Sequence, residues 1–214
     1  MKISYCIGIH NEPPHYIETL LNQILKYKDP EDEVIVVDDY SDNPETLASI
    51  KKYEDRISFN QHALSGDFSQ LKNYGTSLAT GDWIFCIDGD ENVHQNLLLS
   101  IKEIILNNPS IELYYIPRIN IVNGITPEYI KEQNWIISPE GYINIPDAQG
   151  RIYKNDPARI QWKGKVHERI EGHRVHSFLP FQDETGKVIP DYCILHIKDF
   201  ERQKQQNLLY NKMI

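Results

Sequence analysis

The sequence lacks any long hydrophobic run and contains little cysteine. No stretch approaches the roughly 18 apolar residues that a membrane-spanning helix needs, so no transmembrane segment is expected. The first residues, MKISYCIGIH, enter a strand-like pattern without the features of a secretory signal, which makes the cytosol the expected compartment. Cys6, Cys86 and Cys193 lie in apolar runs without the spacing of a metal site, which favours buried free thiols over a disulfide.

A surplus of basic residues is also missing. Lys and Arg number 22 against 31 Asp and Glu, and the formal net charge is −9. Phosphate backbones are held by excess Lys and Arg, so a nucleic-acid partner is not expected. An acidic chain can still bind a small diphosphate if a divalent cation lies between the two sets of negative charge.

The first half predicts an α/β fold. Short β-rich runs at 3–9, 33–39, 56–60 and 83–87 alternate with segments of helical periodicity, the pattern of a mostly parallel sheet with helices on both faces. The helices are expected to begin near Pro13, at Asn43, at Asp67 and after Asn92. Of these, the third is expected to end near Ala79.

The pattern changes after about residue 107. Extended, Pro- and Gly-punctuated runs predict a smaller mixed or antiparallel half, with a possible turn at 127–133. We therefore expect a single domain, 1–214, divided into a nucleotide-binding half (1–110), an acceptor half (111–198) and a C-terminal helix (199–214). Phe200, Leu208 and Leu209 are the side chains expected to dock that helix.

Two groups of carboxylates follow predicted strands. In FCIDGDEN (85–92), Asp88 and Asp90 flank Gly89, a spacing that suits an oxygen-ligated Mg²⁺ or Mn²⁺ and that also occurs in solvated turns. Asp38 and Asp39 end another strand, where they could bind a ribose or base or cap the next helix. Because ligands of open α/β sheets bind at the carboxyl ends of the strands, position favours a binding role for both groups.

These segments together resemble a known family. ISYCIGIHNE, EVIVVDDYSDN and LKNYGTSLATGDWIFCIDGDE resemble, in order and separation, the N-terminal half of family 2 glycosyltransferases of the GT-A fold. PDAQGRIYKND, KGKVHERIEG and CILHI resemble, more loosely, the lipopolysaccharide-core and cell-surface branch of that family. The ED and QxxRW segments of processive members are missing, so a polymer-synthesising role is not expected.

The resemblance implies a role for each matching residue. Glu12 and Asp39 would line the base and ribose pocket, and Lys72 and Asn73 would face the nucleotide and its phosphates. Asp88 would contact ribose or metal, and Asp90, with Gly89 between the two, would be the principal protein ligand of the cation. His196 would be a further ligand or a diphosphate contact. Glu168 would be the catalytic base, with Asp147 as second candidate, and Arg151 could steady a phosphate or pair with a carboxylate.

The resemblance implies a metal-dependent, inverting transfer of a sugar from a nucleoside diphosphate sugar to a hydroxyl of a glycan or other cell-surface acceptor. UDP is the commonest donor nucleotide in that family, and the cation would be Mn²⁺ or Mg²⁺. A metal-dependent nucleotidyltransferase, a phosphohydrolase and a non-catalytic nucleotide-sugar-binding module are the alternatives. The sequence leaves the sugar, the acceptor and the oligomeric state open.

The histidines do not by themselves indicate a metal site. His167 and Glu168 resemble the start of a zinc-protease motif, but position 171 is Glu where that motif needs His. His173 and His176 are expected at the surface, and His196 could equally be a hydrogen-bonded core residue.

Overall fold

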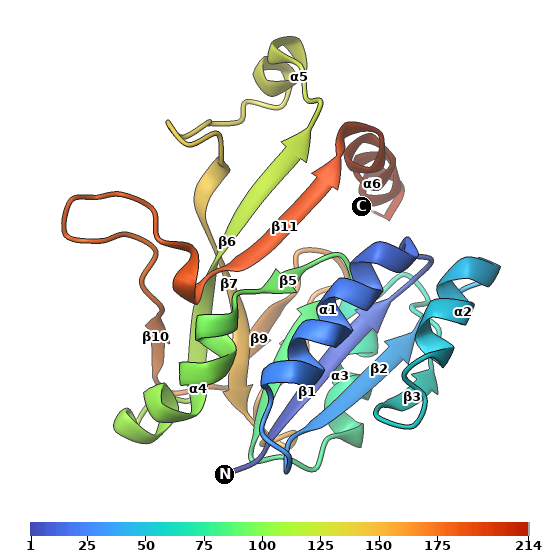
Figure 1. Cartoon of the computed structure of the whole chain (residues 1–214), viewed down its shortest axis with the longest axis vertical. Coiled ribbons are helices and arrows are strands. Elements are labelled where there is room, and N and C mark those ends of the chain that lie inside the picture. The colour runs from blue at the N-terminus through green and yellow to red at the C-terminus, as the bar shows by residue number, and fades with distance from the viewer. Residues whose placement is uncertain (214) are drawn as a thin grey trace.

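The computed structural model describes the backbone of residues 1–213 and the side chains of residues 1–208 (Figure 1). The helices are α1 (Pro14–Tyr27), α2 (Pro44–Lys51), α3 (Phe68–Leu78), α4 (Gln95–Asn107), α5 (Pro127–Glu132), the 3-10 helix η1 (Pro190–Tyr192) and α6 (Phe200–Met213). The strands are β1 (Ile3–Ile9), β2 (Glu33–Asp38), β3 (Ser58–Gln61), β4 (Trp83–Asp88), β5 (Asn92–Val93), β6 (Leu113–Asn123), β7 (Ile143–Lys154), β8 (Gln161–Lys163), β9 (Arg169–Glu171), β10 (His176–Phe178) and β11 (Ile194–Asp199). None of the helices within the described residues is long and apolar enough to cross a membrane.

One nine-stranded sheet runs through both halves of the chain. Its order is β3-β2-β1-β4-β7-β6-β11-β5, and β10 pairs with the start of β6. The strands β3, β2, β1 and β4 are mutually parallel, whereas β7 is antiparallel to both β4 and β6. The β7 strand therefore joins the parallel half to the C-terminal half, and the expected α/β architecture is confirmed.

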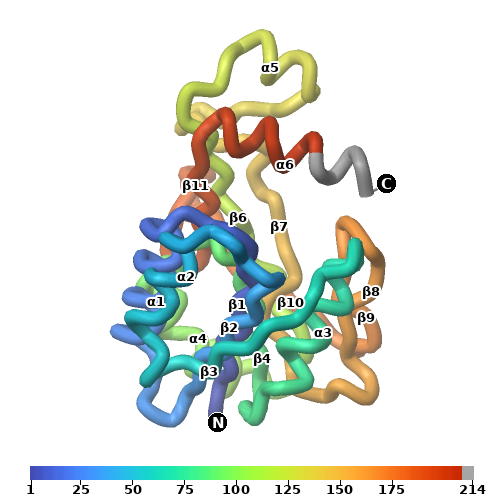
Figure 2. The backbone as a smooth tube through the Cα atoms, turned by 90° about the vertical axis from the view of Figure 1, so that its right-hand side faces the viewer, coloured from blue at the N-terminus to red at the C-terminus, as the bar shows by residue number. Residues whose placement is uncertain are grey.

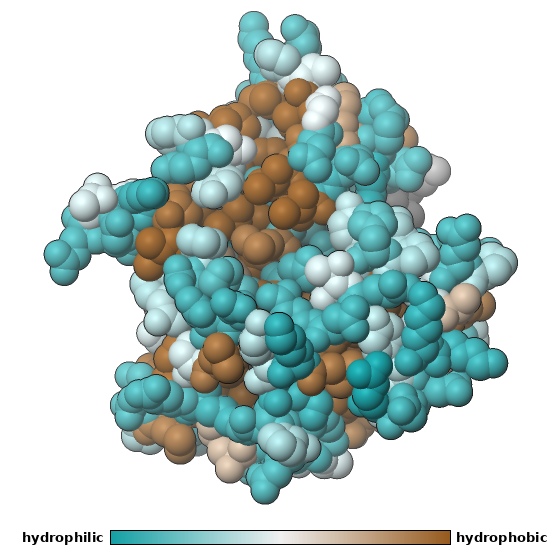
Figure 3. All heavy atoms as spheres, viewed as in Figure 1, coloured by the Kyte–Doolittle hydropathy of each residue, from teal (hydrophilic) through white to brown (hydrophobic). Residues whose placement is uncertain are grey.

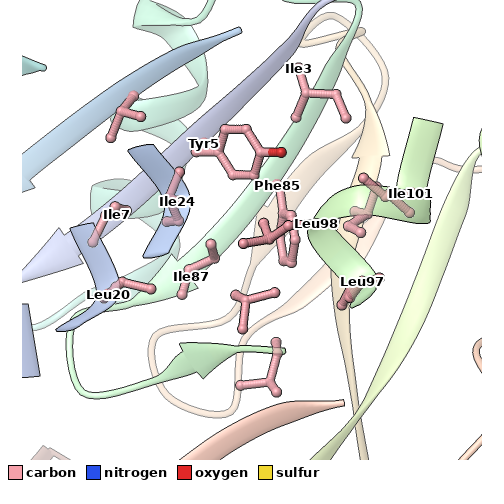
Figure 4. Packing of buried hydrophobic residues seen from close by; sticks show 14 of the residues in the cluster. Ile3, Tyr5, Ile7, Leu20, Ile24, Phe85, Ile87, Leu97, Leu98 and Ile101 are labelled. Atoms are coloured by element: carbon pink, nitrogen blue, oxygen red, sulfur yellow. The ribbon is translucent and has the colours of Figure 1, made fainter. Parts of the chain in front are cut away.

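Helices cover both faces of the parallel half, as expected. On one face the apolar side chains of α1, α2 and α4 form one cluster with those of β1, β2 and β4, in which Leu20, Phe85 and Leu97 are fully buried (Figure 4). On the other face α3 and the small β8–β9 hairpin cover Cys6, Ile35 and other apolar side chains. In the view of Figure 1 the described helices leave β6 and β11 uncovered, and hydrophobic residues reach the surface there (Figure 3).

The parallel half brings the carboxyl ends of its strands together. Gly8, near the end of β1, is level with Val37 of β2 and Asp88 of β4. Residues just beyond these positions therefore lie at one edge of the sheet, the ligand-binding edge of open α/β folds. The start of α6 crosses above this edge (Figure 2).

Several local expectations hold. All three cysteines are buried free thiols. Asn43 caps α2 through its Oδ1 atom, which accepts the Glu45 N–H at 2.9 Å, and Asp67 caps α3.

Other local expectations need correction. Neither Asp38 nor Asp39 caps α2, because Asn43 does so, and β2 ends at Asp38. The possible helical turn at 127–133 is present as the short helix α5, whereas much of the extended run expected at 135–145 is loop. Leu208 is 62% exposed and does not dock α6. Phe200 does, through an edge contact with Tyr129, and the side chain of Leu209 lies outside the described residues.

We expect Gly172→Ala to lower the free energy of unfolding sharply. Gly172 has a φ of +88°, and an added Cβ would lie 1.8 Å from the Arg159 carbonyl oxygen. Gly186→Ala is the matched control, since Gly186 has a φ of +83° and nothing within 4 Å of its Cβ position. Urea unfolding should show a loss at least about 2 kcal/mol larger for Gly172→Ala than for the control, because only that variant adds a clash. Equal losses would contradict the packing of the β8–β9 hairpin.

Candidate active site

A cavity of about 670 Å³ lies at the carboxyl edge of β1 and β4. Residues of β7, the loop after β8, β11 and α6 complete its wall. It brings together most of the residues that the sequence singles out. These are Glu12, Asp39, Lys72, Asp88, Gly89, Asp90, Arg151, Glu168 and His196.

The turn after β4 explains why a glycine separates two aspartates. The Gly89 N–H donates to the Gly8 carbonyl at 2.9 Å, which draws the turn against β1. A Cβ on Gly89 would lie 2.7 Å from Ile9 Cγ2 and 3.3 Å from Glu12 Cδ. Glu91 closes the turn, because its Oε2 accepts the Asp88 N–H at 3.0 Å. The turn is therefore packed into the fold and is not a solvated surface turn.

A row of alternating charges runs from this turn into the C-terminal half. Arg151, which is 2% exposed, donates to Glu91 Oε1 at 2.6 Å and to Asp88 Oδ2 at 2.7 Å. On one side Arg118 extends the row, 3.2 Å from Glu91 and 2.7 Å from Asp147. On the other side Lys72 extends it, 3.2 Å from Asp88 and 2.7 Å from Glu168. The full row is Asp147–Arg118–Glu91–Arg151–Asp88–Lys72–Glu168, which we call the charge row.

The charge row keeps its central members ionised. Burial opposes ionisation of Asp88, but the positive charges of Arg151 and Lys72 outweigh burial and hold the pKa of this carboxyl well below its usual range. Burial also opposes protonation of Lys72, and the Asp88 carboxylate outweighs it and raises the pKa of the ammonium. Both groups therefore carry their charges at neutral pH.

Asp90 belongs to a second set of contacts, made with β11 and α6. Its Oδ2 accepts the Gln206 side-chain N–H at 2.9 Å and lies 3.5 Å from His196 Nε2 and 3.6 Å from Arg202. Burial opposes ionisation of Asp90, yet His196 and Lys198 hold the pKa of the carboxyl far below its usual range. Lys198 is itself buried, and burial lowers its pKa to about 8.

Asp90 and His196 have the donor atoms that a divalent cation needs. His196 Nδ1 lies 2.8 Å from Asn120 Oδ1, whose amide nitrogen donates to Asp147. Nδ1 therefore carries a hydrogen, and Nε2 is the nitrogen that faces the Asp90 carboxylate. Such a contact requires either a proton on Nε2 or a cation shared by the two groups. Among the described residues no group of three or more His, Cys, Asp or Glu side chains forms a metal site, so further ligands would have to come from phosphate or water.

The two candidate bases differ in their surroundings. Glu168 lines the cavity, where its carboxylate accepts a hydrogen bond from Lys72 at 2.7 Å. Asp147 does not line the cavity, and its carboxylate accepts from Arg118, Asn120 and Gln149. Burial opposes ionisation of Asp147, but Arg118 and the amides outweigh it and lower the pKa. The geometry therefore favours Glu168 as the group that accepts a proton in the cavity.

The strand-end aspartates of β2 have different environments. Asp38 is fully buried and binds the backbone N–H and hydroxyl of Ser41, a structural role. Asp39 lines the cavity, where its Oδ1 accepts the Leu64 N–H at 2.8 Å. Asn73 does not face the cavity as expected, because both ends of its amide bind the backbone of Trp162 in β8 at 2.9 Å. It fixes the β8–β9 hairpin on α3.

The sequence did not reveal the partners of the predicted residues. Arg118, Lys198, Arg202 and Gln206 line the cavity, and buried Glu91 supports it from behind. Arg118 and Lys198 could have been noticed in the sequence, because each is a charged residue inside the otherwise apolar run of β6 or β11. Nothing in the polar sequence of α6 marks Arg202 and Gln206, because their role depends on where the helix crosses the sheet.

The fold and the cavity together define a class of protein. A parallel α/β half carries carboxylates at its carboxyl edge, and a mixed half closes a cavity over them, an arrangement suited to a nucleotide ligand. The family model Glycosyl transferase family 2 matches residues 4–183. The chain belongs to this family.

Individual relatives agree with the family. The chain is 38% identical over 84 residues to the poly(ribitol-phosphate) beta-N-acetylglucosaminyltransferase TarP of Staphylococcus aureus, a match that covers 38% of this chain and 25% of TarP. It is 32% identical over 103 residues to the glycosyltransferase GlyG of Streptococcus pneumoniae, covering 47% of this chain and 34% of GlyG. The chain thus spans about a quarter to a third of these relatives.

Solved structures confirm the GT-A fold. The structure of S. aureus TarS 1–349 with UDP-GlcNAc superposes with a TM-score of 0.61 at 20% identity, covering 92% of this chain and 59% of that one. The structure of TarS 1–349 alone gives a TM-score of 0.57 at 22% identity, with 84% and 58% covered. At these identities the likeness shows the fold and nothing of the ligand.

We expect Glu91→Gln to destabilise the protein by about 3 kcal/mol, because its buried carboxylate binds both Arg118 and Arg151, and each arginine would keep only one carboxylate partner. Glu184→Gln, in an exposed loop, is the control of equal charge change. Chemical denaturation at pH 7 measures both variants. A loss within about 0.5 kcal/mol of the control would contradict the role of Glu91 as the centre of the charge row.

The stability of the metal-free protein should depend on pH through Glu12. Burial and the nearby Asp90 raise the pKa of Glu12 to about 7 from 4.5, so the folded state keeps a proton that the unfolded chain loses. The protonated Glu12 side chain stabilises the folded state fully below pH 4.5. This stabilisation is lost as the pH rises to 7, so the free energy of unfolding falls by up to roughly 3 kcal/mol.

Glu12→Gln should remove this fall. Denaturation in EDTA at several pH values between 4.5 and 7.5 compares the variant with the unmodified protein. If the free energy of unfolding changed with pH in the same way in Glu12→Gln and in the unmodified protein, the raised pKa of Glu12 would be contradicted.

Proposed function

We propose that the protein is a glycosyltransferase that moves a sugar from a nucleoside diphosphate sugar, with UDP as its nucleotide, to a hydroxyl of a cell-surface glycan acceptor. The observation that carries the proposal is the cavity, in which Asp39, Asp90, His196 and Glu168 all line one space. TarP, which is named as an N-acetylglucosaminyltransferase, supports a nucleotide-sugar donor. TarS, which shares the fold, was solved with UDP-GlcNAc.

Asp39 and its neighbours would bind the nucleoside. Asp39 uses one carboxylate oxygen to accept the Leu64 N–H, while Oδ2 lies 3.7 Å from His10. Apolar Leu64, Leu71 and Val37 line the same part of the cavity. A flat base would contact these side chains and donate a hydrogen bond to the carboxylate.

Asp90 and His196 would hold Mn²⁺ or Mg²⁺, and the open ligand positions would go to the diphosphate. The cation would offset negative charge on the departing diphosphate. Lys198 and Arg202 lie beside Asp90 and would add fixed positive charge there. Gln206 would have to yield at least part of its contact with Asp90.

Glu168 would take the proton of the acceptor hydroxyl as that oxygen attacks the anomeric carbon. Lys72, bonded to both Glu168 and Asp88, fixes the base relative to the carboxylate turn. Attack from the face opposite the diphosphate inverts the anomeric configuration. A base of this kind contributes roughly a hundred- to ten-thousand-fold to the rate.

We expect Glu168→Gln to retain UDP binding and to lower kcat at least about a hundredfold. UDP affinity by calorimetry and UDP release from UDP-GlcNAc measure the two effects. Asp147→Asn is the control that separates the candidate bases, since its carboxylate lies outside the cavity. A larger kcat loss in Asp147→Asn would assign the base to Asp147, and unchanged turnover in Glu168→Gln would favour a non-catalytic binding module.

Asp39→Ala should weaken UDP binding about tenfold both in Mn²⁺ and in EDTA, because its hydrogen bond goes to the nucleoside and not to the cation. Asp38→Ala, at the neighbouring position, is the comparison variant. It should lower the free energy of unfolding and leave UDP affinity unchanged, because Asp38 binds Ser41 and does not line the cavity. If only the Mn²⁺-dependent part of the affinity of Asp39→Ala changed, Asp39 would belong to the cation site.

A further inference from the structure

The loop that carries Glu168 lies on a hairpin with an unusual charge arrangement. Strands β8 and β9 pair antiparallel, and the loop between them contains Lys165, His167 and Glu168. Lys163 of β8 and Arg169 of β9 are directly opposite each other, so two positive charges face the same side of the hairpin. Like charges in this position repel and destabilise a hairpin.

The hairpin cannot relieve this repulsion by shifting its register. Trp162 and Ile170, the next pair along, are buried against the core, and Trp162 donates its indole N–H to Tyr153 at 2.9 Å. Asn73 binds the backbone of Trp162 through both ends of its amide. A shift by one residue would expose Trp162 and break these bonds.

These cations also lack the partners that the cavity cations have. The side chains of Lys163, Lys165 and Arg169 are exposed, and within residues 1–208 none of them has a carboxylate at ion-pair distance. Lys163 donates to the neutral amide of Gln161, and Glu171, which pairs with Gln161, lies two pairs further from the loop than Lys163 and Arg169. By contrast Lys72, Arg118 and Arg151 are each held between two carboxylates.

Along the chain, the three cations flank the loop residues that line the cavity. Val166, His167 and Glu168 line the cavity, and the Lys165 carbonyl accepts the Phe68 N–H, which fixes the loop beside α3 (Figure 2). These three positive charges contrast with the net charge of −9 of the whole chain. Local charge of one sign attracts a ligand of the opposite sign.

We propose that Lys163, Lys165 and Arg169 form a binding site for an anionic acceptor, one that carries a phosphate or carboxylate group next to the hydroxyl attacked at Glu168. The inference rests on the proposed function for the identity of the ligand as an acceptor. An anionic group between Lys163 and Arg169 removes their repulsion and places the neighbouring hydroxyl at the cavity.

Binding of defined oligomers tests this site. The probes are hexamers of ribitol phosphate, of galacturonate and of neutral maltose-type glucan, measured by calorimetry with UDP and Mn²⁺ present. The unmodified protein should bind one of the two anionic probes at least about tenfold more tightly than the neutral one, and the stronger of the two identifies phosphate or carboxylate. The preference should weaken as salt is raised.

The triple variant Lys163→Gln, Lys165→Gln, Arg169→Gln should lose at least about tenfold in affinity for the anionic probe. The control variant Lys51→Gln, Lys131→Gln, Lys187→Gln removes the same charge at exposed positions elsewhere and should bind as the unmodified protein does. UDP affinity should stay within about twofold in both variants, which shows that the fold and donor site are intact.

Equal affinity of the unmodified protein and the triple variant would overturn the proposal. So would a neutral probe bound as tightly as the anionic ones, equal losses in both variants, or no binding of any probe. Failure of the proposed function is separate, since it would appear as absent UDP binding by the unmodified protein.

Discussion

The charge row centred on Glu91 is the interaction on which the rest of the site depends. Three carboxylates at the end of one strand repel each other, and the turn that holds Asp88, Asp90 and Glu91 is stable because arginines from β6 and β7 reach it. Glu91 has no exposed side-chain surface and binds both arginines. The turn of the N-terminal half therefore depends on the C-terminal half for its stability.

The carboxylates of this turn face two separate sets of positive charge in the cavity. The charge row fixes Asp88 and leads through Lys72 to Glu168, so it connects the turn to the candidate base. Asp90 faces the other way, toward His196, Lys198 and α6. One strand end thus positions both the candidate base, through Lys72, and the candidate cation pair, and a single glycine lets its backbone approach β1 closely enough to do so.

The sequence could predict what depends on local pattern and on topology. Period-two and helical patterns located β1, β2, β4 and most helices. The rule that parallel strands share a ligand-binding edge was enough to bring Asp39, Asp88 and Asp90 together.

Contacts between distant segments could not be predicted in this way. Asn73 directly follows the cavity residue Lys72, yet the direction of its side chain depends on a strand 89 residues later. Glu91 resembles any other acidic turn residue in the sequence, because only the fold places Arg118 and Arg151 beside it. Leu208 fits an apolar pattern on a helix that has no apolar surface to cover at that position.

The central claim is that the turn after β4 binds a nucleotide diphosphate through a shared cation. Calorimetric titration of the protein with UDP, once with Mn²⁺ and once with EDTA, tests it most directly. We expect binding in Mn²⁺ that weakens at least about tenfold in EDTA, because the carboxylates would then repel the diphosphate. Equal affinity in the two buffers, or no binding in either, would contradict the claim.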